Sequence, residues 1–476
     1  MQQIADFVLS VVQTVNAYLS DYILIILLVG AGLFFTIKTR FVQVRCFGEG
    51  MKRVFGGIKL VGGKQENGMS SFQALATAIA AQVGTGNIVG ASGAILIGGP
   101  GAIFWMWVIA FLGMATIYAE AVLAQETRVV KDDGEILGGP VYYIRKAYKG
   151  SFGKVLAGFF AVANILALGF MGCMVQSNSI SESCNTAFGV EGWIVGLVLA
   201  VISAFIFVGG VNRLASVTEK LVPFMAIIFL IGGFFVLGIR VKYIPETFGM
   251  IFKYAFMPQA IIGGGIGMAI KTAISQGAKR GLFSNEAGMG STPHAHAQAN
   301  VEKPHHQGVF AMVGVFIDTF IVLTMTSLVV ISCIYAGKDA DTVKALIESG
   351  VITKTNAMQT AFGQQMATIF GESLGTQIGN IFVAVCLAFF AFSTVIGWNF
   401  FGKINVKYLF NNSRIAVLIY SVISIGFVFL GTLLSNDLVW ELTDFFNYLM
   451  VIPNVLGLIP LTGLVINASK KESPLK

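Results

Sequence analysis

Charged side chains are scarce in this chain. They account for 12% of its 476 residues, whereas apolar residues account for 55%. Because soluble domains typically carry about 25% charged residues, this composition excludes a soluble globular protein. The chain also lacks an arginine-rich tract with interleaved aromatic residues, which argues against nucleic acid as a partner.

Paired cysteines and nucleotide-binding motifs are also missing. The five cysteines are scattered and contain no CxxC, so they predict no disulfide framework. Residues 57–65 miss the register of a phosphate-binding loop, and Gly84-x-Gly86-x-x-x-Gly90 has one residue too many for a dinucleotide fingerprint. No soluble stretch is long enough for an ATPase. Any transport must therefore run on an ion gradient, and no cofactor is predicted.

Long apolar runs dominate what is present. A membrane-spanning helix needs about 20 apolar residues, and the chain has segments of this kind at 21–38, 70–98, 101–126, 154–177, 191–210, 221–239, 257–283, 308–336, 376–402, 412–432 and 437–467. Residues 1–22 contain no Lys, Arg or small-residue cleavage site, so they predict no signal peptide. Their apolar spacing predicts a short amphipathic helix on the membrane surface.

Basic residues are distributed unevenly between the two sides of this arrangement. One side holds 25 Lys and Arg residues and the other holds six, which together account for all 31. Basic loops face the cytoplasm. The sequence therefore predicts a multi-pass plasma membrane protein with its N-terminus outside and its C-terminus inside.

The segments also predict an internal symmetry. Without the first segment, ten segments remain, which divide into two sets of five. Because each set has an odd number of segments, the second set has the opposite orientation in the membrane from the first. The expected fold is all-α and polytopic, with about 11 transmembrane helices, one peripheral helix and a 5+5 inverted repeat. The predicted parts are 1–69 (surface helix, extra helix and cytoplasmic loop), 70–239 and 257–467 (the repeats), and 468–476 (a cytoplasmic tail).

Each repeat opens with a glycine-interrupted segment, at Gly84–Gly90 and at Gly263–Gly267. Irregular backbone at bilayer depth survives only beside a cavity or buried in protein, because an unpaired N–H or C=O in hydrocarbon costs several kcal/mol. Either glycine run alone could be a helix-packing surface. Their matching positions favour a binding site between two discontinuous helices, with Gln82 and Thr85 facing the cavity and Asn87 as a coupling or structural residue.

Three other segments carry polar side chains at membrane depth. Ser393 and Thr394 offer hard oxygen ligands for a cation, although such hydroxyls often bond to their own i−4 carbonyl. Trp398 follows one turn later and would close a small pocket, unless it belongs to an interfacial aromatic belt. Gln176, with Asn178 and Ser179, either lines the pocket or caps a helix end.

Intramembrane acids are functional candidates by default. Glu120 lies near the cytoplasmic end of its segment, where pairing with Arg128 is the alternative role. Asp318 lies deeper and could serve a cation, a proton or a structural salt bridge.

The four histidines follow a polar stretch after Lys279. They are His294, His296, His305 and His306. HxH and HH pairs suit Zn²⁺, but the spacing matches no standard motif and no cysteine is nearby in the sequence. A solvated cytoplasmic loop is therefore preferred, and Na⁺ is the only metal ion predicted.

Several stretches resemble the alanine or glycine:cation symporter family, within the amino acid-polyamine-organocation superfamily. They are GTGNIVG (84–90) with GGPGA (98–102), YAEAVLAQ (118–125), RGLFSNEAGMG (280–290) and STVIGW (393–398). The resemblance implies cation-coupled uptake of a small neutral amino acid across a bacterial or archaeal plasma membrane. It also implies the 5+5 inverted-repeat fold of amino-acid and neurotransmitter:sodium symporters.

The resemblance further implies ligands for Na⁺. The cation would lie between main-chain carbonyls and hydroxyls contributed by Ala80, Val83, Phe390, Ser393 and Thr394.

It also implies how an amino acid would bind. The carboxylate would meet N–H groups around Thr85 and Gly86, and the ammonium group would face Gln82 and carbonyls of the second glycine run. The residues of that run are Gly263, Gly264, Gly265 and Ile266. Trp398 and Phe170 would bound a pocket for a small side chain.

The sequence thus predicts a Na⁺-coupled symporter, and no enzyme, that imports alanine or glycine by alternating access. Its partners would be Na⁺, the amino acid and lipid. A symporter of the same fold that is specific for glutamine or driven by protons is the alternative. Outside this class, an ion channel and an intramembrane metalloenzyme using the histidines are the rival hypotheses.

Overall fold

The computed structural model describes residues 2–56, 68–207, 210–257 and 266–470, which are almost entirely helical. Two short antiparallel strands, β1 (Val129–Val130) and β2 (Ile136–Leu137), form a hairpin. The all-α prediction is confirmed apart from this hairpin.

The helices up to residue 239 are α1 (Gln2–Tyr18), α2 (Ile25–Lys38), α3 (Val42–Arg45), α4 (Phe47–Phe55), α5 (Ser71–Gln82), α6 (Ala91–Gly98), α7 (Ala102–Thr127), α8 (Pro140–Ala147), α9 (Gly150–Asn164), α10 (Cys173–Phe188), α11 (Gly192–Phe207) and α12 (Gly210–Ile239). Those that follow are α13 (Ile244–Phe256), α14 (Ile266–Asn285), α15 (Pro293–His296), α16 (Pro304–Val315), α17 (Thr324–Val330), α18 (Ala340–Glu348), α19 (Ala357–Phe370), α20 (Glu372–Leu409), α21 (Arg414–Gly431), α22 (Asn436–Leu458) and α23 (Thr462–Lys470). Short π-helical segments interrupt them at Leu19–Leu24, Gly86–Gly90, Ile165–Gly172, Phe316–Leu323 and Ile331–Tyr335, and 3-10 turns lie at Val241–Tyr243 and Ile459–Leu461.

Most of the predicted membrane segments are long apolar helices. In the described part of the chain, eight helices are long and apolar enough to cross a membrane, or nine if the bent pair α5 and α6 is one span. The apolar α11 has 16 residues, and residues 258–265 of the seventh segment lie outside the described residues. The total of 11 spans therefore stays a prediction.

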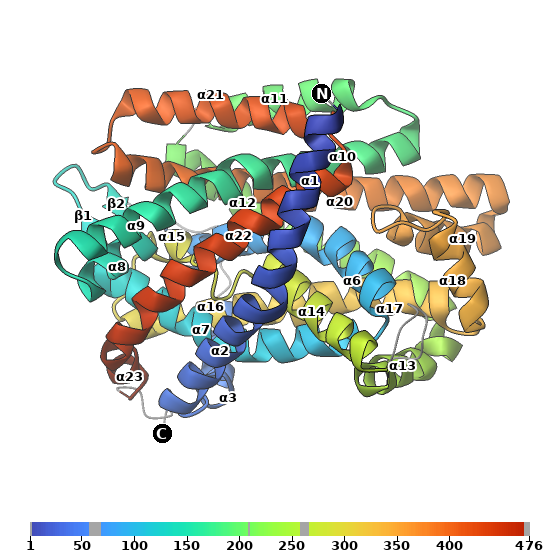
Figure 1. Ribbon diagram of the computed structural model, residues 1–476, viewed down its shortest axis with the longest axis horizontal. Coiled ribbons are helices and arrows are strands. Elements are labelled where there is room, and N and C mark those ends of the chain that lie inside the picture. The colour runs from blue at the N-terminus through green and yellow to red at the C-terminus, as the bar shows by residue number, and fades with distance from the viewer. Residues whose placement is uncertain (1, 57–67, 208–209, 258–265, 471–476) are drawn as a thin grey trace.

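Different helices and strands lie at the two ends of the molecule. Figure 1 shows α7 and α20 running along the long axis, with β1, β2, α8 and α23 at one end and α13, α18 and α19 at the other. We call these the hairpin end and the α18 end. Between them, α21 exposes large apolar side chains such as Ile415, Leu418 and Val422, as expected of a helix that faces lipid.

The first helix differs from the predicted surface helix. The segment Leu19–Leu24 continues α1 into α2, and Leu9–Lys38 forms a single apolar helix of 30 residues. In Figure 1 α1 crosses in front of α22, and Asn16 on α1 donates to the main-chain oxygen of Glu441 at 2.9 Å. The predicted surface helix is therefore the first part of a longer helix.

The first glycine break has the predicted discontinuity. A capping box of Ser70 and Gln73 begins α5, which satisfies two otherwise unpaired N–H groups. Val83 then turns to an extended conformation and ends α5. The π-helical segment Gly86–Gly90 and α6 follow, and this part of the chain is bent by 49° relative to α5. A short turn at residues 99–101 joins α6 to α7.

The second half contains a break after α14 that is not predicted from the sequence. Gly263, Gly264 and Gly265 lie outside the described residues, as does the side chain of Ile266, while Gly267 lies within α14. The helix continues to Asn285, and irregular backbone follows up to α15. Positive φ angles at Glu286 (58°), Gly288 (91°) and Gly290 (79°) mark this break.

Candidate functional site

The five groups expected to bind Na⁺ meet where α20 crosses the end of α5. The Thr394 hydroxyl oxygen lies 3.0 Å from the Ala80 carbonyl, 3.4 Å from that of Val83 and 3.1 Å from that of Phe390. The Ser393 hydroxyl lies 3.2 Å from the Ala80 carbonyl and 2.8 Å from that of Phe390. The structure therefore gathers five oxygen atoms from two helices.

Local sequence explains why these oxygens converge. Carbonyls in the last turn of a helix have no partner within it, and the extended Val83 directs its own carbonyl away from the helix path. A Cβ added to Gly84 would lie 2.3 Å from the Thr394 hydroxyl oxygen, so only glycine allows this approach. Neutral oxygen ligands of this kind suit hard cations. A hydroxyl oxygen also has two lone pairs besides its proton, so it can bind a cation while donating to a carbonyl.

The N–H groups next to this cluster already have side-chain partners. The Gly84 N–H donates to Asn87 Oδ1 at 2.9 Å, and the Thr85 N–H donates to Gln176 Oε1 at 3.1 Å. The Thr85 hydroxyl and Gln176 Nε2 are buried without a hydrogen-bond partner. Buried polar atoms are almost always paired, so these two mark a place where a polar ligand would be accommodated.

Asp318 links the two helix breaks through hydrogen bonds. Its carboxylate accepts from Asn87 Nδ2 at 2.6 Å, from the Ser284 hydroxyl at 2.8 Å and from the Thr319 hydroxyl at 2.8 Å. Asn87 belongs to the first break, whereas Ser284 lies at the end of α14. The three donors are neutral, and none of the described Lys or Arg residues pairs with Asp318.

Gln82 also joins the two breaks. Its Nε2 donates to the main-chain oxygen of Asn285 at 2.7 Å, while its Oε1 is buried without a hydrogen-bond partner. A Cβ added to Gly86 would lie 3.0 Å from the Phe283 ring and 3.1 Å from Ser284 Cα. Gly86 thus lets the first break lie directly against the end of α14.

Glu286 is a site residue that the sequence reasoning missed. It is fully buried, and its carboxylate accepts hydrogen bonds from Trp398 Nε1 and the Ser291 hydroxyl. A positive φ is uncommon for a non-glycine residue, and strained backbone of this kind is often functional. The alternation of glycine and polar residues in 284–290 is the same signal that identified the first break, but it was interpreted as a solvated loop.

Trp398 occupies the interior and not an interfacial belt. Its side chain is 1% exposed and lies edge-on to Phe283, with ring centroids 5.8 Å apart. A Cβ added to Gly172 would lie 2.4 Å from the indole, so this glycine provides the space for the ring. The burial contradicts the interfacial alternative for Trp398, and its role as one wall of a pocket stays a prediction.

Two predicted pocket residues are turned toward α21 instead. Phe170 stacks on Phe427 with ring centroids 4.8 Å apart, so its described ring contacts are not with Trp398. Asn178 donates to the main-chain oxygens of Gly431 and Leu434, which corresponds to the helix-end cap considered for it. Packing against α21 thus decided these orientations, and Gly172 is the residue of this region that meets Trp398.

Glu120 accepts hydrogen bonds from the main chain of the second break and does not pair with Arg128. Its carboxylate accepts from the N–H groups of Gly288 at 3.2 Å and Gly290 at 3.1 Å, and from Asn454 Nδ2 at 2.6 Å. Arg128 instead donates to main-chain oxygens after α15. The irregular backbone needs an acceptor at this depth, and Glu120 supplies it.

Three of the four histidines are buried, contrary to the predicted solvated loop, and His306 is partly exposed. His294, His296 and His305 are at most 2% exposed. The His294 ring lies between Ser291 O at 2.6 Å and Asn405 Nδ2 at 2.9 Å, and His296 Nδ1 pairs with Gln307. These contacts satisfy part of the hydrogen-bonding capacity of the buried segment, while His296 Nε2, Gln307 Oε1 and Asn405 Oδ1 have no hydrogen-bond partner.

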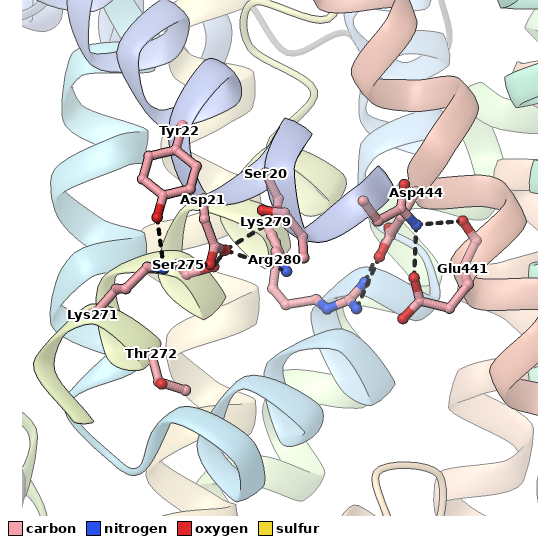
Figure 2. Close-up of polar contacts among 12 residues, drawn as sticks. Ser20, Asp21, Tyr22, Lys271, Thr272, Ser275, Lys279, Arg280, Glu441 and Asp444 are labelled. Carbon is pink, nitrogen blue, oxygen red and sulfur yellow. Dashed lines mark hydrogen bonds and ion pairs between the residues drawn. The ribbon is translucent and has the colours of Figure 1, made fainter. Parts of the chain in front are cut away.

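A group of charged residues lies toward the α18 end of the first break (Figure 2). Asp21 accepts from Ser275 at 2.6 Å and pairs with Lys271 at 3.1 Å, which joins the long first helix to α14. Arg280 pairs with Asp444 on α22 at 3.0 Å. A cavity of 150 Å³ between α1, α6, α14 and α22 is lined by Arg280 and Asp444.

Comparisons with known proteins agree with this architecture. The chain is 40% identical to the sodium/alanine symporter AgcS of Methanococcus maripaludis, over 99% of this chain and 98% of AgcS. It is 34% identical to the probable sodium/glutamine symporter GlnT of Bacillus subtilis, over 99% of this chain and 91% of GlnT. Among solved structures, MhsT in complex with L-phenylalanine has the same fold, with a TM-score of 0.58 at 14% identity over 86% of this chain and 97% of MhsT. A family profile matches residues 5–472, and this multi-pass membrane protein belongs to the Sodium:alanine symporter family.

Proposed function

We propose that this protein couples the inward movement of Na⁺ to the uptake of a small neutral amino acid, with alanine and glycine as the first candidates. The observation that carries the proposal is the cluster of five oxygens around Ser393 and Thr394, directly beside the unpartnered Thr85 hydroxyl and Gln176 Nε2. AgcS, as a sodium/alanine symporter, supports the same substrate class.

The amino acid would bind across the first break. Its carboxylate would accept from the Thr85 hydroxyl and Gln176 Nε2, and from main-chain N–H groups released when Gln176 Oε1 turns away from Thr85. Its ammonium group would donate to carbonyls at the end of α14, where Gln82 now contacts Asn285. In this arrangement Trp398 limits the length of the substrate side chain.

Coupling follows because residues that bind Na⁺ and residues that bind the amino acid lie close together in the sequence. Val83 supplies a carbonyl to the cation, and Thr85, two residues later, faces the amino acid. A bound cation would fix the conformation of this break and so increase the affinity for the amino acid, and linkage makes the effect reciprocal. Each Na⁺ that enters with a zwitterion carries one charge, worth about 2.3 kcal/mol per 100 mV.

The orientation in the membrane is part of the proposal. Lys271, Lys279 and Arg280 belong to the charged group toward the α18 end, so the predicted count of 25 basic residues against six becomes 22 against nine. The remaining asymmetry supports a cytoplasmic hairpin end, because basic loops face the cytoplasm. Substrate would then enter from the α18 end, past the cavity beside Arg280 and Asp444, and the two halves would act as inverted repeats.

Uptake by purified protein in liposomes tests this function. Radiolabelled alanine should accumulate only with an inward Na⁺ gradient, saturably, and glycine or serine should compete with it. Glutamine is the control competitor, because GlnT is a probable sodium/glutamine symporter. Stronger competition by glutamine, uptake driven by a proton gradient alone, or flux that does not saturate would contradict the proposal.

Trp398→Ala should widen substrate selectivity. Removing the indole leaves space beside Gly172 and Phe283, so larger neutral amino acids should compete with alanine more effectively, while the Na⁺ requirement persists. A competition panel of alanine, leucine and phenylalanine measures the effect. Phe170→Ala is the matched control, since its ring packs on Phe427 and its loss should leave the selectivity order unchanged. A Trp398→Ala variant that still excludes leucine would contradict the pocket.

A further inference from the structure

Away from the transport site, Cys46, Glu49 and His305 bring three different metal-binding groups together. The Sγ of Cys46, a carboxylate oxygen of Glu49 and a ring nitrogen of His305 all lie within 4.8 Å of one another. Cys46 lies between α3 and α4, Glu49 in the first turn of α4, and His305 in the first turn of α16. Cysteine and histidine that are 259 positions apart in the sequence thus meet in space.

Neighbouring side chains orient two of these groups. The Tyr118 hydroxyl on α7 lies 2.7 Å from His305 Nδ1, which leaves Nε2 facing Glu49 Oε2 at 3.3 Å. Arg53 donates to the other carboxylate oxygen, Oε1, at 2.6 Å. Metal-binding histidines and carboxylates commonly have such hydrogen-bonded partners, which fix the ring orientation and the ligand basicity.

Close packing holds α4 against α16. A Cβ added to Gly50 would lie 2.9 Å from Val313 Cγ2 and 3.0 Å from the Val309 carbonyl. Cys46 and His305 are themselves buried. The ligand atoms therefore lie on backbone that is already in place, and small side-chain movements suffice to bring them closer.

We propose that Cys46, Glu49 and His305 form a Zn²⁺ site at the hairpin end of the protein. Thiolate, imidazole and carboxylate are the ligands that Zn²⁺ takes in proteins, at about 2.0–2.3 Å, which separates ligand atoms in a tetrahedral site by about 3.3–3.7 Å. The observed spacing, within 4.8 Å, requires a contraction of about 1.5 Å at most. A cavity of 650 Å³ reaches Glu49, one of the three ligands, and a water molecule entering beside that carboxylate would complete the coordination.

Such an ion would act as a clamp between two parts of the chain. It would tie the α3–α4 segment to the first turn of α16, the helix that continues into the segment containing Asp318. Binding to the folded protein alone stabilises it in proportion to the logarithm of metal concentration. This inference does not depend on which substrate the protein transports.

Metal binding to the full-length protein in detergent tests the site. After removal of metals with a chelator, the protein should take up one equivalent of Zn²⁺, and Co²⁺ should give a thiolate-to-cobalt charge-transfer band. Cys46→Ser should abolish the band, and His305→Gln should lower the Zn²⁺ affinity at least tenfold. Zn²⁺ should raise the thermal unfolding temperature of the wild type and leave that of both variants unchanged.

Controls separate this site from adventitious binding. Cys184→Ser and His306→Gln, which keep all three ligands, should bind Zn²⁺ as the wild type does. If Cys46→Ser does not fold, a lower Zn²⁺ affinity in His305→Gln and Glu49→Gln still tests the proposal. Zn²⁺ that remains in Cys46→Ser and His305→Gln, or that is lost in His306→Gln alone, would overturn the proposal, as would the absence of binding.

Discussion

Thr394→Ala should abolish Na⁺-dependent uptake, or raise the Na⁺ concentration for half-maximal uptake by about 10- to 100-fold. The hydroxyl oxygen is within 3.4 Å of three carbonyls, from Ala80, Val83 and Phe390, so its removal takes away the group at the centre of the proposed cation site. Losing an interaction with a charged partner costs about 1.5–3 kcal/mol, which corresponds to this range. Initial uptake rates in liposomes, measured as a function of Na⁺, give the result.

The conservative variant Thr394→Ser distinguishes a ligand from a structural residue. Serine keeps the hydroxyl oxygen and loses only a methyl group, so Na⁺ dependence should stay within a few-fold of the wild type. Alanine uptake by Thr394→Ala with unchanged Na⁺ dependence would reject the site. Equal losses in both variants would assign Thr394 a packing role instead.

The first break and its partners were predictable because each leaves a local signal. Gly84 and Gly86 within an apolar run indicate irregular backbone, and adjacent Ser393 and Thr394 indicate oxygen ligands. The family resemblance then predicted that these two segments lie together, and in the structure they are in contact. Contacts between segments more than 300 residues apart cannot come from spacing alone, so the pairing needed that resemblance.

The break after α14 was not predicted, because the same half has another glycine-rich run whose position corresponds to that of the first break. Gly263–Gly267 matches the first break in position, whereas the 284–290 stretch matches it in composition. Polar content was interpreted as exposure to solvent. In the structure Glu120 and Asn454 satisfy the main chain of this stretch from α7 and α22, and such long-range hydrogen bonds leave no periodic trace in the sequence.

The roles of Phe170 and Cys46 show a second limit. Phe170 is apolar and near Gln176 in the sequence, but the helix turns its ring to Phe427 on α21. Cys46 has no other cysteine or histidine near it in the sequence, but the contact of α4 with α16 brings its Sγ within 4.8 Å of a ring nitrogen of His305. Which face of a helix meets which neighbour depends on packing, and it decides the role of both residues.

Gly84→Ala should abolish uptake, because the new Cβ would lie 2.3 Å from the Thr394 hydroxyl oxygen and 3.0 Å from Gln176 Oε1. Overpacking of this kind costs about 1–3 kcal/mol, so the thermal unfolding temperature should also fall. Both effects arise because α5 and α20 must separate at the point where the cation and amino acid sites adjoin. Uptake assays and thermal unfolding in detergent measure them.

Matched variants isolate the cause of this effect. Gly158→Ala on α9 meets nothing within 4 Å, and alanine favours a helix by about 0.5–1 kcal/mol over glycine, so stability and uptake should be retained. In Gly84→Ala/Thr394→Ala the closest clash is gone, and the unfolding temperature should recover in part while Na⁺-dependent uptake stays lost. Recovery of stability without recovery of transport would separate the packing of the two helices from the binding of the cation. Normal Na⁺-dependent uptake by Gly84→Ala would contradict the close approach on which the site depends.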